Sequence, residues 1–207
     1  FRSARQWRFI SETIAELRDG LGRLGQPLIV RVGEVTDVLE ELKKLHPIQG
    51  LWSHEETGND WTYRRDLRVD AWCRQNTVRR YELQNHGVIR RLKSRNGWAE
   101  RWDKFMQQSV TTSVGLEPVQ LDGGSIPTAR DLGLNDEPCP GRQCGGRRAG
   151  LERLNSFLSH RGERYQRAMS SPLEGSISCS RLSPYLAWGA LSVREVAQAT
   201  EQRRHEL

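Results

Sequence analysis

The sequence predicts an α/β fold, with a partial doubly wound parallel sheet followed by a linker and the first helices of an all-α region. Amphipathic helical patterns alternate with short apolar runs up to about residue 108. A stretch rich in Pro and Gly then interrupts this periodicity, and a helical pattern resumes near Arg148. Alternating helices and strands are typical of parallel sheets built from βαβ units.

The first half of the chain contains the helix and strand signals in alternation. In the first helix, Trp7, Ile10, Ile14, Leu17 and Leu21 recur at spacings of three and four and mark one apolar face. The run 28–32 is apolar and β-branched in its middle, which is typical of a buried strand. We expect helices over about 4–24, 35–45, 61–74 and 97–106, and strands over 28–32, 48–53 and 79–83.

Residues 109–147 are predicted to be a linker, because Pro and Gly recur there without helical or strand periodicity. A helix follows from about Arg148, since Leu151, Leu154, Phe157 and Leu158 define an apolar face. The chain begins at Phe1 and stops inside a helical pattern, so we expect it to be a fragment.

The net charge of +6 and the pI near 9.5 permit a polyanionic partner without requiring one. No apolar run is long enough for a transmembrane helix, so we expect no membrane partner. The four cysteines are scattered, and Cys139 and Cys144 lack a second pair at zinc-site spacing. We therefore expect no metal site and an intracellular, cytoplasmic location.

Two other groups of residues have a chemical and a structural interpretation. His54, Glu55 and Glu56 follow a predicted strand, where acid–base groups gather in open α/β sheets. The favoured alternative is the start of a helix, with Thr57 or Asn59 as its cap. Trp98 and Trp102 stand at helical spacing, which more often reflects packing than electron transfer.

The most informative stretch runs from Cys179 to Gly189 and on to Val196. Ser183 is predicted to cap a helix that starts at Pro184 and ends at Gly189, and Ser192 with Glu195 forms a capping box for the next helix. Helix-start amides beside cationic and hydroxyl side chains suit an anion. By residue chemistry alone, a structural helix cap is the favoured interpretation.

The same stretch, with its Ser-Arg-Leu-Ser-Pro run at 180–184, resembles the flavin-binding signature of the photolyase/cryptochrome family. The segments 28–33, 38–42 and 54–66 are similar to the antenna domain of that family. The resemblance implies a Rossmann-like antenna domain over 1–108 that lacks its N-terminal strand, an interdomain linker over 109–147, and the start of the helical FAD-binding domain over 148–207.

The resemblance implies a blue-light-dependent flavoprotein that binds FAD, with room for a second antenna chromophore of folate or deazaflavin type. The first expectation is a monomeric deoxyribodipyrimidine photolyase, a carbon–carbon lyase whose partner is DNA containing pyrimidine dimers. The alternative is a cryptochrome-type photoreceptor without repair activity. A further alternative, from a different class, is a basic α/β binding module without flavin. We expect this chain alone to be inactive, and the resemblance assigns it no catalytic residue.

The resemblance also implies which residues contact the cofactor. Tyr165 aligns with a tyrosine that approaches the flavin phosphates or ribose, and the other contacts fall in the motif: Cys179, Ser180, Arg181, Leu182 and Ser183. Cys179 stands where many members have Thr, so only a backbone contact is expected there. Arg181 has two open interpretations, a phosphate contact and an ion pair that holds the turn.

Overall fold

The computed structural model describes residues 3–112, 115–135 and 138–206, and these residues form two compact units. One unit combines residues 1–30 with 109–207, and the other comprises residues 31–108. The first helix, α1 (Ala4–Arg23), therefore belongs with the C-terminal helices by its contacts. The domain boundaries near 108 and 147 that the sequence predicts stay predictions.

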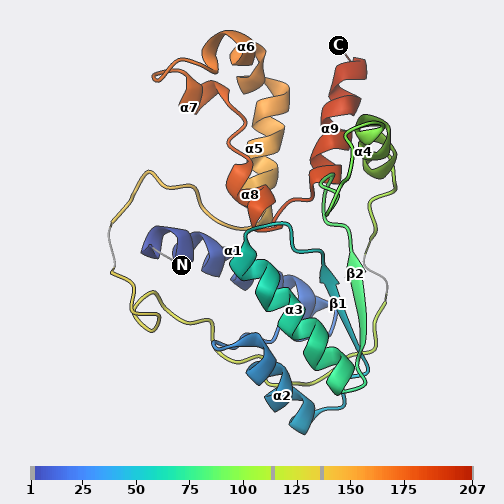
Figure 1. Ribbon diagram of the computed structural model, residues 1–207. Helices are drawn as coiled ribbons and strands as arrows, with labels where there is room; N and C mark the ends of the chain where they lie inside the picture. Colours follow the sequence, from blue (N-terminus) through green and yellow to red (C-terminus); the bar gives the residue numbers. More distant parts are fainter. Residues whose placement is uncertain (1–2, 113–114, 136–137, 207) are drawn as a thin grey trace. The chain divides into compact units, whose positions relative to one another are not determined.

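The unit of residues 31–108 is built on a two-stranded parallel sheet. Strand β1 (Gly50–His54) pairs with β2 (Arg79–Leu83), with Gly50 opposite Arg79 and Trp52 opposite Tyr81. The crossover between the two strands is α3 (Asp60–Gln75), which Figure 1 shows lying along the sheet. Helix α2 (Val35–Leu45) precedes the sheet and α4 (Trp98–Met106) follows it, so this unit is a βαβ unit with two added helices.

The core of this unit lies between α3 and the sheet. Its buried members are Val69, Trp72, Cys73 and Val78, against which Leu39 and Leu51 also pack. A second layer of contacts is ionic. The Arg80 side chain is only 8% exposed and pairs with Asp66 at 2.6 Å, while Arg90 pairs with Asp66 and Glu82. These pairs join β2, α3 and the loop after β2, because each carboxylate accepts from arginines on different segments.

The other unit consists of helices around one apolar cluster. Its elements are α1, α5 (Arg147–Ser159), the 3₁₀ helix η1 (Arg161–Arg164), α6 (Tyr165–Ala168), α7 (Gly175–Ser178), α8 (Ser183–Ala187) and α9 (Val193–Glu206). The buried cluster is Phe9, Leu154, Leu182, Tyr185, Ala190 and Leu191. The rings of Phe9 and Tyr185 meet edge to face at 5.1 Å. Helix α1 therefore shares a core with α5 and α8.

Helix α1 also supplies the polar partners for the start of α5. No side chain of α5 itself caps that helix, whose N-cap residue is Gly146. Instead, Glu12 accepts from the Gly145 amide at 2.7 Å, Thr13 from Gly146 at 2.9 Å, and Glu16 from Arg148 at 3.0 Å. A Cβ added at Gly145 would meet the Phe9 carbonyl oxygen at 2.0 Å, so this close approach requires glycine.

Most helix and strand predictions are confirmed within one or two residues, but the predicted strand over 28–32 is wrong. That segment belongs to no strand. Its Val30 amide donates to the Gly123 carbonyl at 2.8 Å, and the described ladder joins only β1 and β2. Leu17, predicted on the apolar face of α1, is half exposed, and the buried face is instead Ala4, Trp7, Phe9 and Ile10.

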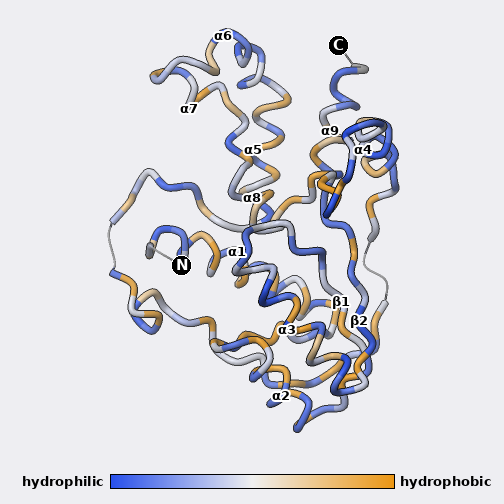
Figure 2. Tube along the Cα trace, viewed as in Figure 1, coloured by the Kyte–Doolittle hydropathy of each residue, from blue (hydrophilic) through white to orange (hydrophobic). Residues whose placement is uncertain are grey.

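Apolar and polar residues are interleaved along the helices rather than segregated into long apolar stretches (Figure 2). Among the described residues, no helix is both long and apolar enough to cross a membrane. This pattern is typical of helices that bury one stripe against a core.

Candidate flavin-phosphate site

The segment 179–183 forms a turn between α7 and α8 whose backbone is held from two sides. Arg181 has a left-handed backbone, with φ of +57°, which is uncommon for a residue other than glycine. Its carbonyl oxygen accepts from Gln143 Nε2 at 2.9 Å. The next residue, Leu182, is 4% exposed and packs in the core with Tyr185. The turn is thus anchored by a buried leucine while Arg181 is exposed.

Arg161 binds the same turn through its guanidinium group. Nη1 donates to the carbonyls of Ile177 at 2.9 Å and Cys179 at 2.7 Å, and Nη2 lies 3.4 Å from the Ser180 carbonyl. The remaining donors bind α5, at Ser156 Oγ (2.8 Å) and the Arg153 carbonyl (3.0 Å). The Arg161 side chain therefore bridges α5 and the backbone of the turn that contains Ser180, Arg181 and Ser183. Sequence analysis did not identify this role.

Three guanidinium groups make the surroundings of the turn electropositive. The pKa of Arg161 is lowered, first by burial and then by repulsion from Arg153 and Arg181. In the described part of the chain the Arg181 side chain makes no ion pair, so the structural pairing considered for it is not found. The segment 175–183 contains no acidic residue. An anion at this turn would therefore relieve repulsion among the arginines.

The predicted cap at Ser183 is wrong by one residue. Leu182 already has helical dihedral angles, so Ser183 is the first residue of α8, Pro184 is the second, and no side chain caps the helix. The Ser183 hydroxyl is consequently exposed and free of a capping role. Gly189, with φ of +68°, follows the end of α8 as expected. The capping box is confirmed, because the Ser192 amide donates to Glu195 and the Glu195 amide to Ser192 Oγ.

The remaining predicted site residues lie on neighbouring segments. Cys179 and Ser180 are half-buried in the turn. Tyr165 begins α6, is 36% exposed, and packs edge to face against Phe157 with ring centroids 5.8 Å apart. Helices α6 and α7 lie beside each other and η1 contacts both (Figure 1), which brings the helix of Tyr165 next to the segment leading into the motif. The site residues therefore belong to one helical cluster.

The described residues of this unit line several cavities. Gln143, Cys144, Arg153, Ser156 and Tyr185 contribute to the lining of a polar cavity of about 380 Å³. Of these, Gln143 also donates to the Arg181 carbonyl in the turn. The Tyr185 hydroxyl donates to the Cys144 carbonyl at 2.8 Å, and burial raises the pKa of Tyr185.

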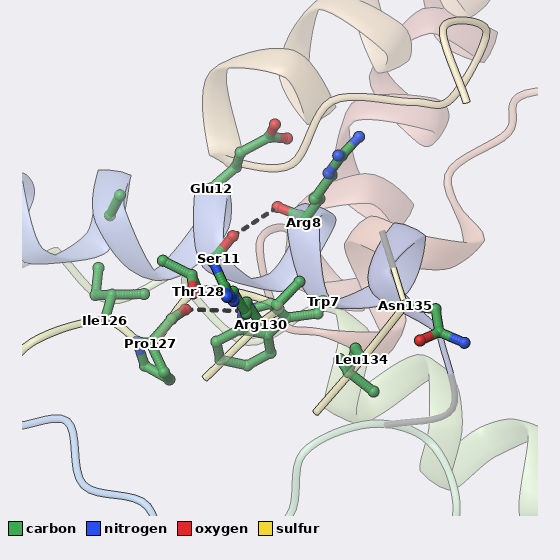
Figure 3. A pocket seen from close by; sticks show the side chains of 12 residues that line it. Trp7, Arg8, Ser11, Glu12, Ile126, Pro127, Thr128, Arg130, Leu134 and Asn135 are labelled. Carbon is green, nitrogen blue, oxygen red and sulfur yellow. Dashed lines mark hydrogen bonds between the residues drawn. The ribbon is translucent and has the colours of Figure 1, made fainter. Parts of the chain in front are cut away.

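A larger, mostly apolar hollow of about 800 Å³ lies between α1 and residues 126–135 (Figure 3). A hydrogen bond of 2.9 Å from Trp7 Nε1 to the Pro127 carbonyl connects the two sides of this hollow. This bond connects α1 to the segment 126–135.

The structural interpretations of the other sequence candidates agree with the structure. Asn59 caps α3 in a reciprocal box with Thr62, and Glu56 accepts from the Gly58 amide and pairs with Arg65. The Trp98 indole donates to the Gly87 carbonyl at 3.0 Å, so this tryptophan is held by packing and hydrogen bonding.

The comparisons with known proteins decide the family. The sequence profile of the family described as DNA photolyase matches residues 1–108, which is more than half of the chain. The chain belongs to the DNA photolyase family. The resemblance seen in the sequence is thereby confirmed at the level of the family.

Two curated relatives match nearly the whole chain. The blue-light photoreceptor PHR2 of Arabidopsis thaliana is 26% identical, and the match covers 91% of this chain and 47% of the relative. The cryptochrome DASH of Gloeobacter violaceus is 28% identical, with 95% and 43% covered. The chain therefore spans about half the length of the curated relatives it matches.

Solved photolyase structures have the same fold. An archaeal photolyase from Sulfolobus tokodaii, solved with two FAD molecules, has a TM-score of 0.70 at 23% identity, covering 97% of this chain and 44% of that one. A bacterial class III photolyase from Agrobacterium tumefaciens has a TM-score of 0.75 at 16% identity, with 99% and 45% covered. At these identities the likeness concerns the fold, and it supports the α/β region followed by helices.

Proposed function

We propose that this chain contributes the phosphate-binding turn of a blue-light-dependent flavoprotein, and that FAD is its cofactor. The observation that carries the proposal is the turn at 179–183, where Arg161 holds the backbone and Arg181 and Ser183 are exposed. Family membership and the FAD molecules of the Sulfolobus photolyase structure support the choice of ligand.

The residues present suit a diphosphate. Guanidinium groups and hydroxyls are hydrogen-bond donors that match phosphate oxygens, and the segment 175–183 has no carboxylate to repel them. Arg181 and the hydroxyls of Ser180 and Ser183 would bind the phosphates, and Cys179 would contribute only its backbone. Tyr165 would approach the ribose or phosphates from α6. When bound, FAD supplies light absorption and electron transfer, while this turn binds and orients the dinucleotide.

For the whole protein we propose repair of cyclobutane pyrimidine dimers in DNA as the activity, with room for a second antenna chromophore. The basic character of the chain supports a DNA partner, since phosphate contacts dominate affinity for nucleic acid. The alternative is a photoreceptor without repair activity. The names of the two curated relatives, a blue-light photoreceptor and a cryptochrome, support this alternative. Blue-light irradiation with a dimer-containing oligonucleotide distinguishes them, because only a photolyase restores the undamaged strand.

The flavin proposal is tested by the visible absorbance spectrum of the protein purified from cells. We expect flavin bands that are weakened in an Arg181→Ala, Ser183→Ala double variant. The matched control is Arg167→Ala with Ser176→Ala, which removes the same two residue types from exposed positions outside the motif. A folded, colourless protein that fails to take up added flavin would contradict the proposal and favour a basic binding module.

A further inference from the structure

We propose that the loop after β2 and the helix α4 form a second, independent surface that binds the sugar–phosphate backbone of nucleic acid. We call this surface the basic loop and define it by five exposed side chains: Arg91, Lys93, Arg95, Arg101 and Lys104. All five lie in the unit of residues 31–108, so the proposal does not rest on the flavin site.

The charge of this segment is concentrated and of one sign. Residues 90–104 contain six Lys and Arg against two acidic residues, Glu100 and Asp103. This short segment therefore has a net charge of +4, in a chain whose total is +6. A concentration of cations on one exposed segment raises the local density of counter-ions and attracts polyanions.

Most of the Lys and Arg side chains in this segment form no ion pair with the described residues of the chain. Arg90 is the exception, because it pairs with Glu82 and Asp66 and belongs to the ionic layer of the core. Within the part of the chain that the structure describes, Lys93, Arg95 and Lys104 make no ion pair or side-chain hydrogen bond. Charges that remain exposed and unpaired are available to release counter-ions from a nucleic acid when they bind its phosphates.

The basic loop is also held in shape. Arg91 has φ of +59°, its guanidinium donates to the Tyr63 hydroxyl, and it lies 5.9 Å from the centre of the Tyr63 ring. Arg101 Nη2 donates to the Asn96 carbonyl at 3.1 Å, which closes the turn before α4. Both arginines have further donors that can bind phosphate, since a guanidinium carries five N–H groups. A pre-shaped loop loses less conformational entropy on binding.

An exposed aromatic ring favours nucleic acid over other polyanions. Trp98 is 38% exposed in the middle of the segment and is oriented by its bond to Gly87. Bases stack on such rings, whereas phosphate-only ligands and lipid headgroups offer no planar partner.

The test measures binding of the 207-residue chain to fluorescein-labelled oligonucleotides in the dark, so that no photochemistry contributes. Undamaged single-stranded dT20 and a 20-base-pair duplex are titrated at several salt concentrations. We expect both to bind, with an affinity that falls as salt rises. Removing Lys93 and Arg95 as Lys93→Gln and Arg95→Gln should lower the salt slope by about 1.4 for the single strand and about 1.8 for the duplex.

The matched control is Arg5→Gln with Arg23→Gln, which lowers the net charge equally from exposed positions on α1. We expect this control to retain the wild-type slope. The absence of oligonucleotide binding would overturn the proposal. Equal decreases of the salt slope in the two double variants would also overturn it, because binding would then depend only on the net charge of the chain. Vesicles containing anionic lipid form a further arm. If the chain bound these vesicles through Lys93 and Arg95 but did not bind oligonucleotides, the proposal would be overturned, and the partner of the basic loop would be a membrane surface.

Discussion

Replacing Arg161 by Ala should loosen the turn that carries the motif. The guanidinium donates to the carbonyls of Ile177 and Cys179 and to α5, with its shortest bonds at 2.7 Å to Cys179 and 2.8 Å to Ser156. Each bond from a charged donor contributes about 1.5–3 kcal/mol, but bonds from one side chain are not additive and Arg161 is partly solvated. We therefore expect a loss of about 2–4 kcal/mol in the unfolding free energy of the helical unit.

Urea unfolding gives the total effect, and amide hydrogen exchange of peptides covering 175–190 shows whether the loss is local. Arg161→Lys should recover less than half, because one ammonium group cannot span α5 and the turn. Arg167→Ala is the control, since this exposed neighbour should change stability by less than about 0.5 kcal/mol. An Arg161→Ala variant with wild-type stability and unchanged exchange at 175–190 would refute the bridging role.

Two further predictions concern the packing and the pH dependence of the helical unit. In Gly150→Ala, the new Cβ would lie 2.9 Å from Tyr185 Cδ1 and 3.0 Å from Leu191 Cγ, so overpacking of about 1–3 kcal/mol should exceed the gain in helix propensity. Gly20→Ala has only a flexible arginine tip within 4 Å and should stabilise by up to about 1 kcal/mol; urea midpoints that rank the two variants in the opposite order would contradict this. The hydrogen bond from Arg142 lowers the pKa of Glu12 below its ordinary value of 4.5. The ionised Glu12 carboxylate therefore contributes its full stabilisation above about pH 4.5, and this stabilisation is lost as pH falls through the lower pKa of the folded state. Glu12→Gln should therefore flatten the acid side of the curve of unfolding free energy against pH. A variant with the same curve as the wild type would argue against this role of Glu12.

Features that depend on local sequence could be predicted, and those that depend on distant partners could not. The capping box at Ser192 and Glu195 and the stop at Gly189 involve residues within one turn, so the pattern indicated both. The segment 28–32 has the composition of a strand, but a strand requires a ladder of hydrogen bonds. The Val30 amide instead donates to the carbonyl of Gly123, which lies more than 90 residues later and belongs to no strand. Ser183 failed as a cap because the chain becomes helical one residue earlier.

The positioning groups of the site were also beyond sequence reasoning. Arg161, Arg164 and Arg167 look alike in the sequence, where they only add positive charge. Arg161 differs because its guanidinium donates to backbone carbonyls that lie 16 to 19 residues later in the chain. In the same way, the apolar pattern of α1 gave no sign that Glu12 and Glu16 serve the amides at the start of α5. The family signature located the motif residues but not what holds them.

The central claim is that the turn at 179–183 binds the phosphates of FAD, and a titration that compares FAD with riboflavin tests it most directly. Riboflavin has the same ring system without phosphates. We predict that Arg181→Ala with Ser183→Ala weakens FAD binding at least about tenfold, the loss of one charge-assisted contact or more, and leaves riboflavin binding unchanged. Equal affinities of wild type and double variant for FAD, or a parallel loss for riboflavin, would contradict the claim.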